Sequence, residues 1–161
     1  MATVALLGLH LRPPVRELTR DRIAVEARTL ARAQRLTLRA LPRSPAAGPI
    51  GRAALGFAVS AEPGVEPARA LARLVAGLAR LGPVTAVSFL LGPREAEAAA
   101  RLPTVEVEPA DLDREPAAAL FLPDRLYVVS AGEGDGGGPG RRRLGAELRA
   151  LGPAGEDREA G

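Results

Sequence analysis

Residues 3–91 alternate between short β-type segments and longer helix-type segments, and this alternation constrains the fold more than any other feature of the chain. Four apolar or alternating runs have the length and the pattern of strands: residues 3–11, 36–41, 53–62 and 83–91. Two segments that are rich in good helix formers, residues 15–36 and 66–81, lie between these runs. The predicted order is therefore β-α-β-β-α-β.

The second predicted helix has the clearest signal. Leu71, Leu74, Val75 and Leu78 recur at the spacing of one helix face, and a Gly-Pro pair follows the last apolar turn. A β-α-β-β-α-β order is that of the ferredoxin-like split βαβ motif. We therefore expect an α+β protein, a ferredoxin-like βαββαβ sandwich in which an antiparallel sheet carries two helices on one face, with a C-terminal extension.

Shorter segments surround this pattern. Residues 42–52 contain three prolines and two glycines, which predicts a loop. Further along, residues 93–102 predict a short helix, residues 104–109 an edge strand and residues 125–131 another strand.

The C-terminal composition predicts three parts of the chain. Residues 1–131 would form the ferredoxin-like α+β domain, residues 132–140 a Gly-rich linker, and residues 141–161 a short helix and a disordered tail. The Gly-rich run also invites interpretation as a phosphate-binding loop. That loop requires a lysine, and all 22 basic residues of this chain are arginines, so we favour a linker.

Composition excludes several classes of protein. The chain has no cysteine and one histidine, which excludes disulfides, thiolate chemistry and His-rich metal sites. A nucleic-acid surface is not expected, because aromatic residues make up only 2% and the net charge is only +3. No apolar run has the roughly 18 residues of a membrane span and no basic segment precedes the N-terminal apolar run, so we expect a cytoplasmic protein without a membrane partner.

Two polar features could carry chemistry, and both have simpler interpretations. His10 ends an apolar run without an acidic neighbour in sequence, which favours a buried or capping imidazole over a catalytic one. The acidic residues within 108–115 do not have the spacing of a known calcium loop, so we expect a solvated loop. The residues by themselves therefore indicate no catalytic constellation.

Several segments, taken in order, resemble one enzyme family. RLGPVTAVSFLL (80–91) aligns without a gap with the family frame R-W-G-P-R-T-L-D-L-D-L-L. Further matches are LLGLH (6–10), LPRSPAAG (41–48), LGFAV (55–59), DRLYVVSA (124–131) and GRRRLGAEL (140–148). The chain thus resembles the 6-hydroxymethyl-7,8-dihydropterin pyrophosphokinases of folate biosynthesis. Residues 3–91 also resemble a small uncharacterised ferredoxin-like family with an L-G-V-A-V strand.

The resemblance implies a phosphoryl-transfer site that has lost its metal ligands. The family transfers pyrophosphate from ATP to the pterin, and its two aspartates hold two Mg²⁺ ions. Val87 and Phe89 stand at those positions, and Val84 replaces an arginine that would meet phosphate. Neither Val87 nor Phe89 can ligate Mg²⁺, which requires oxygen ligands. The resemblance therefore implies no metal site and no certain cofactor, with Mg²⁺ and ATP expected only if the activity is retained.

The same resemblance implies a set of substrate-binding positions. Ser44, Pro45 and Ala47 match loop positions whose backbone contacts the pterin. Phe57 replaces the asparagine that reads the pterin, and Tyr127 matches an aromatic residue that stacks on it.

Arg125 matches a nucleotide-binding arginine of the family, one that contacts phosphate. Arg125 and Tyr127 share the same predicted strand, and an arginine beside a tyrosine is also ordinary for a strand.

Three hypotheses follow. The first is a pyrophosphokinase-like protein without activity that acts as a binding or partner subunit, with a pterin, another protein or a second copy of the chain as partner. The second is an active enzyme that uses other acids, for example Glu106, Glu108 or Asp111. The third is a non-enzymatic ferredoxin-like interaction module, dimeric through an edge strand.

Overall fold

The structure is a computed structural model and describes residues 2–43, 48–92, 100–113 and 121–130. The predicted linker and C-terminal helix lie outside these residues, as does most of the helix predicted for 93–102. The elements of the described residues are β1 (Thr3–Leu11), α1 (Glu17–Ala33), β2 (Leu36–Leu41), α2 (Gly48–Arg52), β3 (Leu55–Ala61), α3 (Pro67–Ala79), β4 (Val84–Leu91), β5 (Thr104–Val107), the 3₁₀ helix η2 (Pro109–Asp113) and β6 (Leu126–Ser130).

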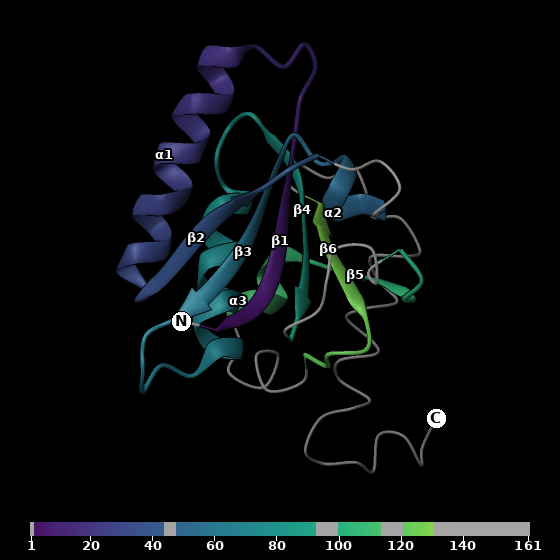
Figure 1. The fold of residues 1–161 in the computed structure, drawn as a ribbon. Helices are drawn as coiled ribbons and strands as arrows, with labels where there is room; N and C mark the ends of the chain where they lie inside the picture. Colours follow the sequence, from purple (N-terminus) through teal and green to yellow (C-terminus); the bar gives the residue numbers. More distant parts are fainter. Residues whose placement is uncertain (1, 44–47, 93–99, 114–120, 131–161) are drawn as a thin grey trace.

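The protein is a mixed α+β structure with one six-stranded sheet in its described part, in the order β2-β3-β1-β4-β6-β5 (Figure 1). Neighbouring strands are antiparallel except for β5 and β6, which are parallel. The expectation of a purely antiparallel sheet is therefore wrong. Residues 108–125 separate β5 from β6, and a connection of a dozen or more residues is what parallel neighbours require.

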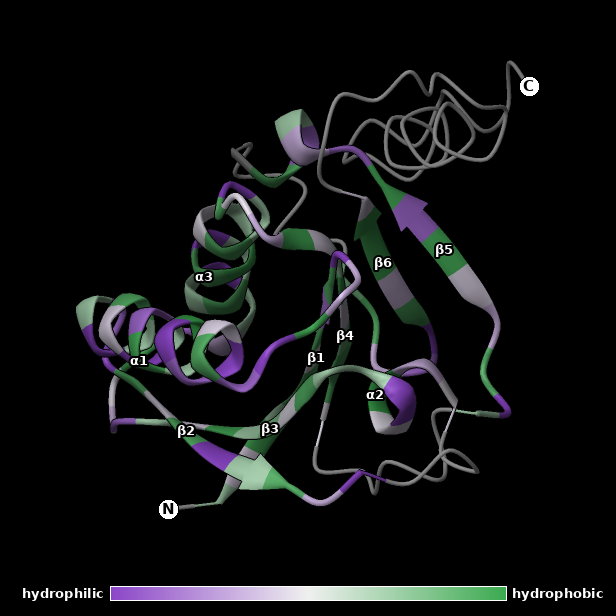
Figure 2. Cartoon of the chain, turned by 90° about the horizontal axis from the view of Figure 1, so that it is seen from above, coloured by the Kyte–Doolittle hydropathy of each residue, from purple (hydrophilic) through white to green (hydrophobic). Residues whose placement is uncertain are grey.

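The helices lie on both faces of the sheet, with α1 and α3 on one face and α2 on the other (Figure 2). The prediction of a loop over 42–52 is wrong for its second half, which forms α2. Gly48 enters this turn at a φ of 74°, and Pro49 follows in the first turn, where its fixed φ suits a helix. Prolines and glycines that indicated a loop therefore begin a short helix.

The face under α1 and α3 carries the main hydrophobic core, which we call the helix-side core. Alternate residues of each strand point into it, as the two-residue period of a strand requires. Its large, fully buried members include Leu7, Leu9, Ile23, Phe57, Leu71, Leu74, Leu78 and Phe89. The opposite face carries a smaller cluster around α2, the α2-side cluster, formed by Leu6, Ile50, Ala58, Leu90 and Leu126.

The strongest sequence signals are confirmed. α3 lies within the predicted 66–81, and the Glu66 carboxylate caps it by accepting a hydrogen bond from the Arg69 backbone N–H at 2.9 Å. β2 has the predicted bounds, and β5 is an edge strand as expected. No helix of the described segments is long and apolar enough to cross a membrane.

Candidate functional site

The α2 face is shaped by a glycine at the middle of β1. A Cβ atom on Gly8 would lie 3.1 Å from both the Ile50 Cα and the Ala53 Cβ. Contacts of that length are tighter than almost all real Cβ contacts, so α2 rests directly on the β1 backbone. The absence of a side chain at Gly8 thus allows the end of α2 to approach β1 closely.

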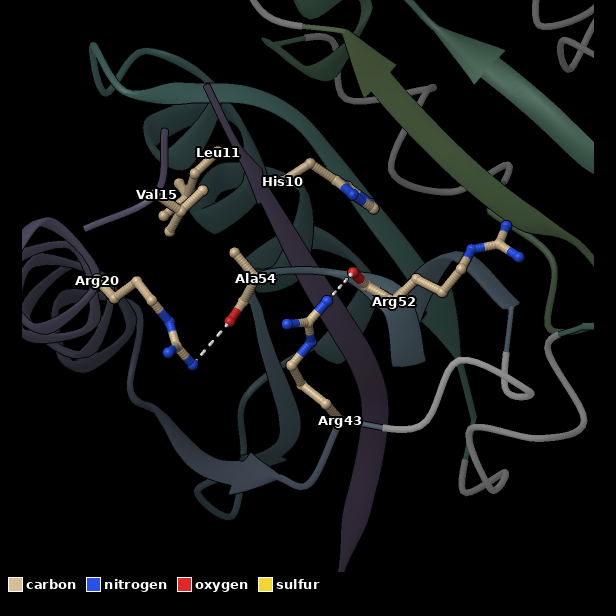
Figure 3. A pocket seen from close by; sticks show the side chains of 7 residues that line it. All are labelled: His10, Leu11, Val15, Arg20, Arg43, Arg52 and Ala54. Carbon is tan, nitrogen blue, oxygen red and sulfur yellow. Dashed lines mark hydrogen bonds between the residues drawn. The ribbon is translucent and has the colours of Figure 1, made fainter. Parts of the chain in front are cut away.

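A polar pocket opens beside this contact and encloses about 260 Å³ (Figure 3). Its lining comes from the end of β1, the start of α1, the segment after β2 and the end of α2. The lining residues are His10, Leu11, Val15, Arg20, Arg43, Arg52 and Ala54. We call it the arginine pocket.

The charge of the arginine pocket is of one sign. Arg20, Arg43 and Arg52 line it, and among the residues that the structure describes no carboxylate does. Within the described ranges, none of the three forms an ion pair with an acidic side chain. Guanidinium groups stay protonated at any physiological pH, so the pocket holds uncompensated positive charge.

Arg20 is the most firmly held of the three arginines. It is half-buried, and its Nη2 donates a hydrogen bond to the Ala54 carbonyl oxygen at 3.2 Å. Its Nε is buried and has no hydrogen-bond partner among the described residues. Arg43 is exposed and held only by a long contact, 3.5 Å from its Nη2 to the Arg52 carbonyl oxygen.

His10 forms the inner polar wall of the pocket. Its Nε2 lies 2.9 Å from the hydroxyl oxygen of the fully buried Ser88, and the Thr85 hydroxyl donates to the His10 carbonyl oxygen at 3.2 Å. Burial lowers the pKa of the imidazole below its ordinary 6.5, and the positive charge of Arg52 lowers it further. His10 is therefore a neutral, half-buried hydrogen-bonding group near pH 7.

The residues expected to bind substrate are not gathered in this pocket. Ser44, Pro45 and Ala47 lie outside the described residues. Phe57 lies on β3 within the helix-side core, with the Arg28 guanidinium carbon 5.4 Å from its ring centre. Tyr127 lies on β6, and β1 and β4 separate β6 from β3.

Tyr127 is enclosed by other aromatic rings. Its ring stacks on Phe89 with centroids 5.3 Å apart and meets Phe121 at 5.0 Å. Its hydroxyl oxygen accepts a hydrogen bond from the Leu122 backbone N–H at 2.9 Å. Arg125 is half-buried just before β6, and its Nε lies 3.8 Å from a carboxylate oxygen of Asp124.

The positions that match the family's metal-binding aspartates are inaccessible to solvent. Val87 and Phe89 are both 0% exposed and belong to the helix-side core. The alternative acids differ in their exposure. Glu106 and Glu108 are half-buried, and Asp111 is buried in η2.

The described residues contain no group of three or more His, Cys, Asp or Glu side chains that could hold a metal ion. The expectation of a solvated loop over 108–115 is wrong at its centre, because η2 forms there and buries Asp111.

Sequence reasoning missed Arg20, Arg43 and Arg52 as a group. They are three of 22 arginines, they come from three separate segments, and no spacing relates them. His10 was singled out, but for a structural role. Only the packing of both α1 and α2 near the end of β1 brings these side chains around one cavity.

We compared the chain with protein families, curated proteins and solved structures. No protein-family model, no curated protein and no solved structure matches the chain.

Proposed function

We propose that the protein is a pyrophosphokinase-like protein of the folate-biosynthesis type that lacks pyrophosphokinase activity and acts as a binding or partner subunit. One observation carries the proposal: the two positions at which that family's metal-binding aspartates align are occupied by Val87 and Phe89, each fully buried. Mg²⁺ requires oxygen ligands, and a close-packed apolar core supplies none. We further expect the protein to act in the cytoplasm, the compartment that the sequence predicts.

The arrangement of the first four strands supports the choice of scaffold. Within the sheet they lie in the order β2-β3-β1-β4, each antiparallel to its neighbour, and α1 and α3 cover the same face. That is the arrangement proposed here as a ferredoxin-like core, to which β6, β5 and α2 are additions. Fold alone does not define activity, so the argument against catalysis depends on residues 87 and 89.

Burial of the expected stacking residue bears on the ligand. Tyr127 is 2% exposed and already stacks on Phe89. A pterin ring could reach it only by displacing packed aromatic side chains. We expect that displacement to cost about 3–5 kcal/mol, the loss found when a large aromatic side chain is removed from a protein core. The proposed subunit therefore does not require a pterin as its ligand.

The test is an assay of AMP formation from ATP and 6-hydroxymethyl-7,8-dihydropterin with Mg²⁺. We expect no AMP above that of a reaction without protein. AMP formation that requires the pterin would overturn the proposal. In that case Glu106→Gln, Glu108→Gln and Asp111→Asn, measured singly, would show whether other acids carry the reaction.

A further inference from the structure

We infer that the arginine pocket binds a phosphate or diphosphate group through its guanidinium groups, without a divalent cation. The inference deepens the proposed binding function and rests on it. It names a site built from residues that the family resemblance does not use. The carrier of the phosphate is a small molecule, of a size that a pocket of about 260 Å³ can accept.

Charge is the first argument. Three arginines line one cavity and no carboxylate of the described residues faces it, so their like charges repel until an anion is bound. Most arginines on a protein surface are dispersed in water or stand near acids. Here, among the described residues, Arg20, Arg43 and Arg52 have no acidic partner, and a phosphate dianion supplies the missing charge.

Hydrogen-bonding geometry is the second argument. A guanidinium group presents paired N–H donors that match the oxygens of phosphate, and such charged hydrogen bonds are about twice as strong as neutral ones. Arg20 is anchored by the Ala54 carbonyl, which orients its remaining donors. Its Nε is buried, so the donors that an anion can reach are those on its two Nη atoms.

The three arginines combine a fixed donor with adjustable ones. Figure 3 shows Arg20 reaching in from α1, Arg43 from the segment after β2, and Arg52 extending from the end of α2 on the side of His10. Arg43 and Arg52 are exposed, and their long side chains can turn toward an anion. His10, hydrogen-bonded to Ser88, gives the inner wall a further polar nitrogen.

Size is the third argument. The pocket volume of about 260 Å³ is smaller than the roughly 300–1,000 Å³ of pockets that enclose drug-sized ligands. A phosphate or a diphosphate fits such a space. The charge of the lining makes the phosphate group the part of a ligand that this pocket binds.

The lining also argues that the anion is bound as itself and not as its magnesium complex. In the usual phosphoryl-transfer site, carboxylates hold Mg²⁺ and the ion bridges to phosphate oxygens. Among the described residues, the arginine pocket presents three guanidinium groups and no carboxylate that could hold the ion. Mg²⁺ would therefore compete with the guanidinium groups for the phosphate oxygens.

The experiment is thermal unfolding and titration calorimetry of the whole chain with sodium pyrophosphate in EDTA, against sodium chloride of equal ionic strength. We expect pyrophosphate to raise the unfolding temperature, because a ligand that binds only the native state stabilises it. Added Mg²⁺ is expected to reduce the shift. Absence of a shift, or a shift that appears only with Mg²⁺, would overturn the inference.

Matched variants locate the site. Arg43→Gln/Arg52→Gln removes two exposed charges of the pocket, and Arg32→Gln/Arg39→Gln removes two exposed charges elsewhere. Each charged hydrogen bond lost corresponds to about a tenfold change in Kd, so the pocket variant should bind pyrophosphate at least about tenfold more weakly. The control variant should stay within about twofold. Equal weakening by both would mean that the overall charge binds the anion, which contradicts a site.

Failure of this inference differs from failure of the proposed function. AMP formation would overturn the absence of activity whatever pyrophosphate does. A lack of pyrophosphate binding together with a lack of AMP formation would remove the anion site and leave the proposal of a non-catalytic subunit in place. The wild-type chain decides both questions, so neither depends on a variant that fails to fold.

Discussion

The two faces of the sheet differ in what fills them. Under α1 and α3, the strands bury large apolar side chains, and Val87 and Phe89 are completely enclosed. On the α2 face, β1 presents Gly8 and His10, and β4 presents Ser88, at positions that alternate with those of the core. The first face is closed to solvent, whereas the polar cavity begins at His10 on the second face and reaches around the end of β1 to the start of α1.

This difference shows where a function can remain. The helix-side core contains the positions that would carry metal chemistry in the resembling family, and there they contribute packing. Burying an ionised group in such surroundings costs free energy, so a carboxylate introduced on that face would destabilise the folded protein. The cavity at the end of β1 keeps polar groups beside water and is the place where a ligand can bind without disturbing the core.

The largest expected effect comes from placing a carboxylate in the closed face. Val87→Asp should lower the free energy of unfolding by about 3–5 kcal/mol, because an uncompensated charge would be buried in the core. Val128→Asp is the matched control, since Val128 pairs with Ser88 in the sheet and is half-buried on the opposite face. Urea unfolding of both variants should show a clearly smaller loss for the control, and equal losses would contradict the contrast between the faces.

A smaller effect is expected where α2 rests on β1. Gly8→Ala introduces a Cβ 3.1 Å from the Ile50 Cα, so α2 must shift, and we expect a loss of about 1–3 kcal/mol. Gly82→Ala is the control, because a Cβ there meets nothing within 4 Å. The same displacement of α2 should weaken pyrophosphate binding through Arg52. Unchanged stability of Gly8→Ala relative to Gly82→Ala would show that α2 is not seated on the glycine.

The smallest effect concerns the pH dependence of the polar face. The pKa of His10 is below 6.5 in the folded state, through burial and then through Arg52, so the unfolded chain binds a proton first as the pH falls. His10 thus contributes full stability above pH 6.5 and loses it progressively below that value, toward its folded-state pKa.

The groups around His10 are the Ser88 hydroxyl, which hydrogen-bonds its Nε2, the Thr85 hydroxyl, which hydrogen-bonds its carbonyl oxygen, and the positive charge of Arg52. Since the chain has one histidine, His10→Gln should remove the stability loss just below pH 6.5. Unfolding free energies of wild type and variant across this range test it, and identical pH profiles would contradict it.

The sequence predicted well those strands and helices whose residues show a clear alternation or helical spacing. β2 has its predicted bounds and α3 lies inside its predicted range, because alternation and helical spacing reflect which side of an element is buried. The short helix α2 was missed, since its Pro and Gly residues are also typical of loops. The parallel pairing of β5 with β6 was missed as well, because strand direction depends on a long connection and not on the residues that pair.

The candidate site was less predictable than the fold. The loss of acids at Val87 and Phe89 is visible in the sequence frame, within an apolar run that predicts a strand. The arginine pocket was not visible, because a side chain at residue 20 comes near others at 43 and 52 only when α1 and α2 are both placed near the end of β1. Site prediction from one sequence needs a spacing or a motif, and this site has neither.

By itself, the sequence determined which segments bury apolar surface, the order of the four strands and two long helices over residues 3–91, and the absence of thiol chemistry and of aspartates at residues 87 and 89. Only the tertiary structure decided the mixed direction of the sheet, the presence of α2 and the face that it covers, and the meeting of three arginines at one cavity. The reason is the distance along the chain over which each property is set. Burial patterns repeat within one element, whereas charge is concentrated by contacts between elements far apart in the chain.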